Sequence, residues 1–86
     1  MNTSVEISMY PLKEDYKPAI ISFIKNLRKY PFIKVDTNGM STQIFGDYKR
    51  VMNAINTEME KTFKNSNSVV FNLKVINADL EEKPRF

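Results

Sequence analysis

Four segments of the chain alternate apolar and polar side chains with a period of two, which is typical of strands that bury one face. These segments are residues 4–10, 33–37, 40–45 and 69–76. The dipeptide Asn38-Gly39, between the second and third segments, is a strong signal for a tight β-hairpin. We therefore predict four strands, with the middle two joined by a hairpin.

Apolar residues at helical spacing predict two helices, one before and one after this hairpin. The apolar stripes are Ile20, Phe23, Ile24 and Leu27 in the first helix, and Tyr48, Val51, Met52, Ile55, Met59 and Phe63 in the second. We expect Asp15 to cap the first helix, Pro18 to lie in its first turn, and the helix to stop before Pro31. Asp47 is the expected cap of the second helix, which ends near a turn at residues 65–67.

The order strand, helix, strand, strand, helix, strand is that of an α+β ferredoxin-like domain with a four-stranded antiparallel sheet. Both helices then cover one face of the sheet, and the first and third strands are central neighbours. At 86 residues the chain is long enough for one such domain. We assign it to residues 1–78 and expect the charged segment 79–86 to form a flexible tail.

The strand alternation separates residues that face the helices from residues on the opposite, uncovered face. Met40, Thr42 and Ile44 are expected to face the helices, and Met40, Met52 and Met59 to fill the core. The uncovered face is expected to carry Glu6, Ser8, Tyr10, Ser41, Gln43 and Phe45, with Asn38 at its rim. Hydroxyl, amide, carboxylate and aromatic groups on one surface suit a small polar heterocycle.

Composition removes several function classes. The chain has no cysteine and no histidine, so disulfides, thiolate metal sites and cysteine nucleophiles are excluded and the commonest general base is missing. Its charge of +3 is spread over the sequence without a basic block, which predicts no nucleic-acid partner. The absence of a leader-like start or a long apolar stretch predicts a cytoplasmic protein without membrane insertion.

Two segments resemble a known family. Glu6-Ile7-Ser8-Met9-Tyr10-Pro11-Leu12, together with Met40-Ser41-Thr42-Gln43-Ile44-Phe45-Gly46-Asp47 and the following Val51-Met52, is similar to the thiamine-binding YkoF-type family. Gln43 and Phe45 replace aliphatic and acidic residues found in other branches. The resemblance implies a ferredoxin-like protein that binds thiamine or its hydroxymethylpyrimidine part without catalysis or a cofactor. It also implies a homodimer or homotetramer.

We hypothesise a role for each polar or aromatic group on the uncovered face. The predicted ligand-binding residues are Glu6, Ser8, Tyr10, Asn38, Ser41, Thr42, Gln43 and Phe45. Glu6 accepts a hydrogen bond from an exocyclic amine or offsets a positive charge, and the hydroxyls and amide supply further hydrogen bonds. Tyr10 or Phe45 stacks on the ring.

Simpler interpretations of the same residues remain open. Glu6 is equally suited to a cross-strand ion pair with Lys74, and Tyr10 and Phe45 to contacts in a dimer. A ligand-free structural or regulatory oligomeric domain is therefore one alternative. A single-stranded RNA-binding module is a weaker one, because the third strand has no Lys or Arg. An enzyme is a further alternative, but no catalytic constellation is present.

Overall fold

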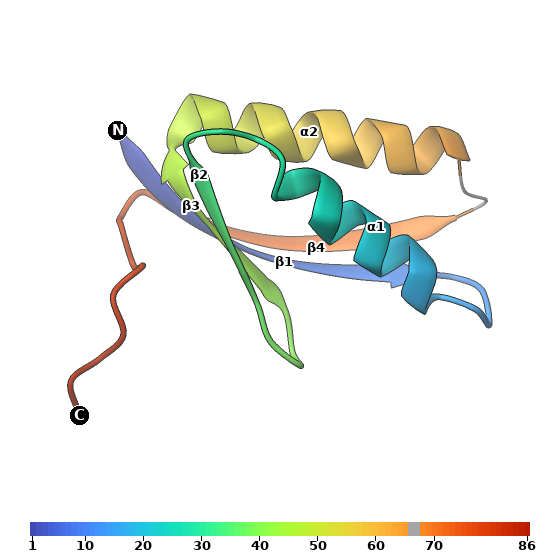
Figure 1. Cartoon of the computed structure of the whole chain (residues 1–86), viewed down its shortest axis with the longest axis horizontal. Helices are drawn as coiled ribbons and strands as arrows, with labels where there is room; N and C mark the ends of the chain where they lie inside the picture. The colour runs from blue at the N-terminus through green and yellow to red at the C-terminus, as the bar shows by residue number, and fades with distance from the viewer. Residues whose placement is uncertain (66–67) are drawn as a thin grey trace.

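Six elements follow one another in the computed structural model, which describes residues 1–65 and 68–86. They are β1 (Asn2–Pro11), α1 (Lys17–Leu27), β2 (Ile33–Thr37), β3 (Thr42–Asp47), α2 (Tyr48–Asn65) and β4 (Val69–Ile76). The strands form one antiparallel sheet in the order β2-β3-β1-β4. Both helices lie on the same side of this sheet (Figure 1). The predicted α+β ferredoxin-like arrangement is confirmed.

The core lies between the helices and the face of the sheet that they cover. Its buried members are Val5, Ile7 and Met9 of β1, Ile44 of β3, Phe23 and Leu27 of α1, and Val51, Ala54 and Ile55 of α2. These are the apolar positions that alternate along the strands and recur along the helices, so burial follows the sequence pattern. Met52 and Met59 pack against this core, as expected.

The helix starts agree with the sequence in one case and not in the other. Asp47 caps α2, because its Oδ2 accepts a hydrogen bond from the Arg50 backbone N–H at 3.3 Å. The expectation that Asp15 caps α1 is wrong: Tyr16 holds the cap position and makes no side-chain cap bond. Pro18 lies in the first turn of α1, where its missing N–H costs nothing. Of the predicted turn at residues 65–67, Asn65 ends α2 and the other two residues lie outside the described part.

The β2–β3 hairpin turns where Asn38-Gly39 predicted it, but its loop is longer than expected. The Asn38 Oδ1 accepts hydrogen bonds from the backbone N–H of Met40 at 2.8 Å and of Ser41 at 3.1 Å. This closed turn delays the start of β3 to Thr42. Met40 therefore points away from the core and is 90% exposed, so its expected role as core filler is wrong.

β1 is longer than its pairing with β3. β3 pairs with β1 only from Asn2 to Ile7, whereas β4 pairs with β1 from Ser4 to Pro11. The last residues of β1 therefore have a neighbour on the β4 side, while the hairpin diverges from them on the other side. This difference in length opens a gap at one end of the sheet.

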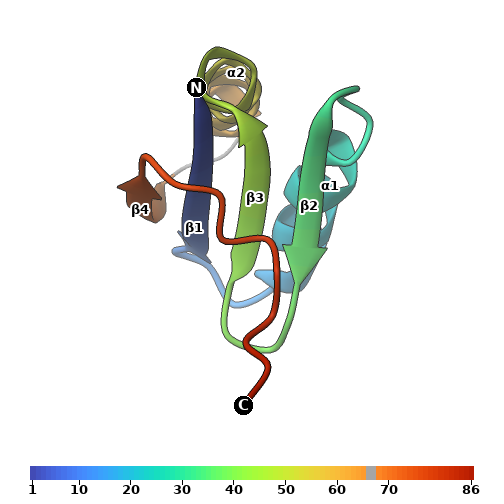
Figure 2. The ribbon, with the colours of Figure 1, turned by 90° about the vertical axis from the view of Figure 1, so that its left-hand side faces the viewer.

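The segment after β4 returns across the face of the sheet that the helices leave uncovered. In Figure 2 it passes in front of β1 and β3. The Ser4 hydroxyl of β1 donates a hydrogen bond to the Ala78 carbonyl at 2.7 Å and accepts one from the Leu80 N–H at 2.8 Å. Ser4 is buried as a result, although it lies on the uncovered face of the strand.

Candidate functional site

The eight predicted ligand-binding residues do not form one patch. They divide between two hollows at opposite ends of β1. Ser8, Tyr10, Asn38, Ser41 and Thr42 line the hairpin-end hollow, which is bounded by the end of β1, the β2–β3 hairpin and α1. Glu6, Gln43 and Phe45 line the tail-end hollow, which lies between the uncovered face and the segment after β4.

The strand register explains this division. Glu6 is directly opposite Gln43, and Ser4 is opposite Phe45, so Gln43 lies four residues from Tyr10 along β1. At about 3.3 Å per residue, this separates Tyr10 from the level of Gln43 by roughly 13 Å. Tyr10 and Gln43, both expected on the uncovered face, therefore lie at different levels of the sheet, whereas Tyr10 and Ser41 line the same hollow.

The hairpin-end hollow has a volume of about 170 Å³ and combines an apolar wall with polar groups. Its wall includes Ile20, Phe23 and Ile24 of α1. These side chains reach it because β3 does not run alongside the last residues of β1. The sequence pattern did not identify these three residues as site residues. Their helical spacing is the same for a core face and for the wall of a pocket, so no sequence signal separates the two uses.

Several polar groups of the hairpin-end hollow keep free hydrogen-bonding capacity. The hydroxyls of Ser8 and Tyr10 make no hydrogen bond to any other residue in the described ranges, 1–65 and 68–86. Asn38 uses its Oδ1 in the turn, which leaves its amide N–H groups as donors. Thr42 is buried, and its hydroxyl already pairs with the Thr37 hydroxyl at 3.0 Å.

A short hydrogen-bonded chain connects the two hollows. Ser41 Oγ donates to Glu6 Oε2 at 2.9 Å and accepts from Gln43 Nε2 at 2.9 Å. Lys74 Nζ lies 3.6 Å from Glu6 Oε1, so the cross-strand ion pair anticipated for Glu6 is present. A serine hydroxyl has one donor and two acceptor positions. Ser41 therefore has its proton committed and one acceptor position left.

The tail-end hollow is largely apolar, with a volume of about 330 Å³. Phe45, Val75 and Ile76 lie on its sheet side and Leu80 on its outer side. Phe45 is only 9% exposed, so the expectation that its ring forms exposed aromatic surface is wrong. Its role in stacking or in a dimer stays a prediction. Leu80 was not anticipated, because one apolar residue inside a charged segment carries no periodic signal.

Away from both hollows, a buried carboxylate of α2 binds the segment that follows α1. Glu58 of α2 is 3% exposed and accepts hydrogen bonds from the Tyr30 hydroxyl at 2.6 Å and from Lys61 Nζ at 3.1 Å. The hydrogen bond to Glu58, burial and the negative charge of Glu58 raise the pKa of Tyr30. This cluster is satisfied internally and fastens the end of α1 to α2.

Within residues 1–65 and 68–86, no three acidic side chains lie together in a group that could hold a metal ion. Neither helix of this part of the chain has the length and apolar character needed to cross a membrane.

Comparison with known proteins identifies the family. The family of thiamine-binding proteins matches residues 5–83, and the chain belongs to it. No curated protein sequence matches the chain.

Solved structures share the fold at low sequence identity. A hypothetical protein from Methanocaldococcus jannascii is 24% identical, with a TM-score of 0.77 over 98% of this chain and 88% of that one. A Thermotoga maritima protein, described with a suggested role in thiamine biosynthesis or salvage, is 17% identical, with a TM-score of 0.77 over 87% and 82%. A Streptococcus pneumoniae protein is 17% identical, with a TM-score of 0.72 over 93% and 90%.

Proposed function

We propose that this member of the thiamine-binding family binds thiamine, or its hydroxymethylpyrimidine part, in the hairpin-end hollow and does so without catalysis. One observation carries the proposal: five of the eight residues predicted from sequence line this single hollow, and several of their polar groups are free. The tail-end hollow, by contrast, is nearly all apolar and partly closed by the chain itself.

The free groups complement an aminopyrimidine. Its exocyclic amine needs an acceptor, and Ser41 is set up as one because Glu6 already takes its proton. Its ring nitrogens need donors, which the Ser8 hydroxyl and the Asn38 amide supply. Tyr10 and Phe23 offer aromatic surface to the ring. Glu6 then acts through Ser41 rather than by direct contact.

The volume of the hollow favours the pyrimidine ring as the part that enters. Pockets for drug-sized ligands measure about 300 Å³ or more, so a hollow of about 170 Å³ takes only a fragment of such a ligand. The remainder of thiamine, with its cationic ring, then lies outside near the hairpin. We accordingly expect hydroxymethylpyrimidine alone to retain most of the affinity.

The wider role is part of the same proposal. We infer a homodimer or homotetramer that holds the ligand for salvage, buffering or delivery in the cytoplasm, with no nucleic-acid partner. Tyr10, Val70 and Ile76 are exposed apolar residues on the uncovered face, which supports self-association through that face.

Isothermal titration calorimetry of the full chain with thiamine, hydroxymethylpyrimidine and thiamine phosphate tests the ligand. We expect dissociation constants below about 1 mM for thiamine and for hydroxymethylpyrimidine. Failure of all three compounds to bind below that concentration would overturn the proposed function while leaving the fold untouched.

A further inference from the structure

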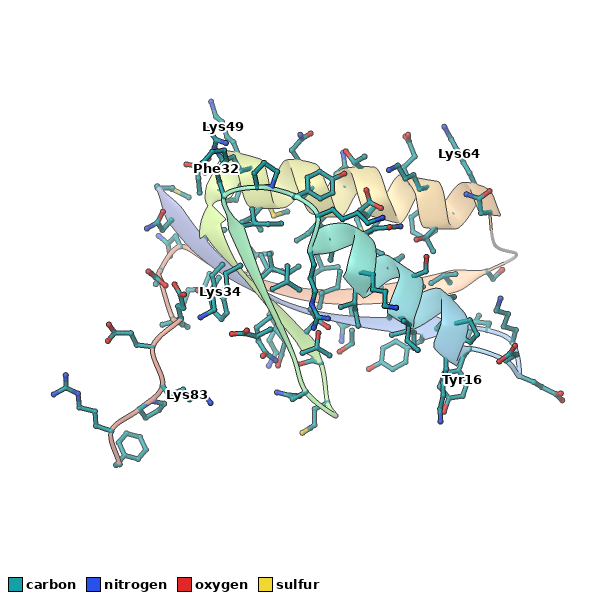
Figure 3. The ribbon with its side chains drawn as sticks, in the orientation of Figure 1. Tyr16, Phe32, Lys34, Lys49, Lys64 and Lys83 are labelled. Atoms are coloured by element: carbon teal, nitrogen blue, oxygen red, sulfur yellow. The ribbon has the colours of Figure 1, made fainter. Side chains whose placement is uncertain are left out.

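The segment that crosses the uncovered face is tied down at two points. We call residues 78–81 the C-terminal strap. Ser4 of β1 holds its first part through the two hydrogen bonds to Ala78 and Leu80. Lys34 Nζ of β2 lies 2.9 Å from Glu81 Oε1 and holds its end. Lys34 lies on the side of β2 from which the C-terminal segment approaches (Figure 3). The strap thus reaches from one side of the sheet to the other.

The strap is held weakly enough to be displaced. Two neutral hydrogen bonds contribute only modestly to stability because water competes for the same groups, and the ion pair between Lys34 and Glu81 is exposed to solvent. Leu80 covers part of the tail-end hollow but remains exposed itself, so little apolar area holds it there. The hollow of about 330 Å³ beneath the strap shows that the packing is incomplete.

The strap covers only part of the apolar surface on this face. Tyr10, Val70 and Ile76 are each between 45% and 53% exposed. An exposed sheet face with several large apolar residues favours association with a partner. Phe45 adjoins this surface, in a hollow that Leu80 of the strap also lines.

Charge on the same face suits a second copy of the chain. Glu6 and Lys74 are directly opposite each other on the neighbouring strands β1 and β4. Consider a two-fold axis that is parallel to these strands and lies above the uncovered face, over the line between the two strands. Such an axis sets Glu6 of each copy against Lys74 of the other. Such a surface is self-complementary in charge, as an isologous interface requires.

We propose that the C-terminal strap competes with a second copy of the chain for the uncovered face and so limits self-association. The inference rests on the self-association proposed above. In the strapped state, residues 78–81 occupy the end of the face near Ser4 and Phe45. In the associated state, the strap leaves, and Phe45 and Ile76 pack against the other copy.

Truncation provides the test, with a closely matched control. A chain that ends at Asn77 loses the strap, whereas a chain that ends at Glu81 keeps every anchored residue and loses only residues 82–86. We expect sedimentation velocity over a range of concentrations to give at least tenfold tighter self-association for the shorter chain. The chain ending at Glu81 should behave as the full chain does. An unchanged or weakened association of the shorter chain would overturn the proposal.

Charge reversal tests the same idea without shortening the chain. Lys34→Glu removes one anchor and should tighten association, and the double variant Lys34→Glu with Glu81→Lys should restore the behaviour of the full chain. A merely general effect of charge on β2 would not be reversed by the second change, and absence of rescue would count against the strap. Leu80→Ser, at an exposed position, serves if the truncated chain fails to fold; it should also tighten association.

The experiments can disprove the proposed ligand and the proposed role of the strap independently of each other. If the truncated chain associates more tightly but no form binds thiamine, the strap stands and the proposed ligand is wrong. If thiamine binds but all forms associate equally, the ligand stands and the strap proposal is wrong. If every form is monomeric at all concentrations, the proposed self-association fails and the strap proposal fails with it.

Discussion

The two ends of β1 carry hollows of different character, although the same alternation of residues runs through both. At the hairpin end, β3 has stopped and the polar groups of Ser8 and Tyr10 are free. At the tail end, β3 and β4 both flank β1, Phe45 is buried, and the C-terminal strap covers the sheet. Free polar groups at one end favour a polar ligand, whereas covered apolar groups at the other favour packing. The point where β3 stops pairing with β1 therefore matters more than the residue pattern. It decides whether the face of β1 offers polar groups to a ligand or packs against the rest of the chain.

The largest effect is expected where an aromatic side chain at each end is truncated. Phe45→Ala should reduce the free energy of unfolding by about 3 kcal/mol, because it removes a buried ring. Tyr10→Ala, at a side chain that is 53% exposed, should cost less than about 1 kcal/mol. Urea denaturation followed by circular dichroism measures both values. Equal losses of unfolding free energy would show that Phe45 and Tyr10 are buried alike. The two ends of β1 would then not differ in packing.

A change remote from both ends should affect stability alone. Tyr30→Phe removes a hydrogen bond to the buried Glu58 carboxylate and should cost about 1.5 kcal/mol. Ligand affinity and self-association should stay within twofold of the unmodified chain. A change in either one would mean that helix packing controls the hollows, and the two ends could then not be treated separately.

Tyr30 should also make the free energy of unfolding depend on pH. The pKa of Tyr30 is raised in the folded chain above its ordinary value of 10.0, so its contribution is complete below pH 10. As the pH rises from 10 through the folded value, the unfolded chain loses its proton first and stability falls. Urea midpoints between pH 9 and pH 11 should decline more steeply for the unmodified chain than for Tyr30→Phe. Parallel declines would contradict this role of Glu58.

Two serines of β1 allow a matched comparison of the hollows. Ser8→Ala removes a free hydroxyl at the hairpin end and should weaken thiamine binding about tenfold, the value of one hydrogen bond. Ser4→Ala removes the hydroxyl that anchors the C-terminal strap and should leave affinity unchanged. Calorimetry measures both. The reverse order of effects would move the ligand to the tail end.

The smallest effect is expected at Thr42, whose hydroxyl is already paired with Thr37. Thr42→Val keeps the shape of the side chain and should change thiamine affinity by less than threefold. A loss of more than tenfold, with stability intact, would mean that the ligand contacts the helix-facing side of β3 and that Thr42 is a direct ligand-binding residue.

Much of the fold follows from the sequence because its signals are local. Alternation, helical spacing and the Asn38-Gly39 turn are read within a few residues, and they determine the order and approximate bounds of all six elements. The division of the site does not follow from them, since it depends on where β1 and β3 stop pairing. That register is set by packing between segments more than 30 residues apart in the chain.

Two errors at single residues have equally definite causes. Met40 was expected in the core because it continues the alternation of β3, but the side chain of Asn38 holds it in the turn. Phe45 was expected to be exposed because it faces away from the helices, but it is 9% exposed and lines a hollow together with Leu80 of the C-terminal strap. Neither a side-chain turn of this kind nor a returning terminal segment produces a periodic pattern.

The most direct test is a titration of the ¹⁵N-labelled full chain with thiamine, followed by backbone amide chemical shifts. We predict that the largest shifts map to Ser8–Tyr10 and to Asn38–Thr42, around the hairpin-end hollow. Residues of the tail-end hollow, from Ser4 to Val5 and from Val75 to Leu80, should move little. If the largest shifts lay at the tail end, or if millimolar thiamine caused no shifts, the proposed binding of thiamine in the hairpin-end hollow would be wrong.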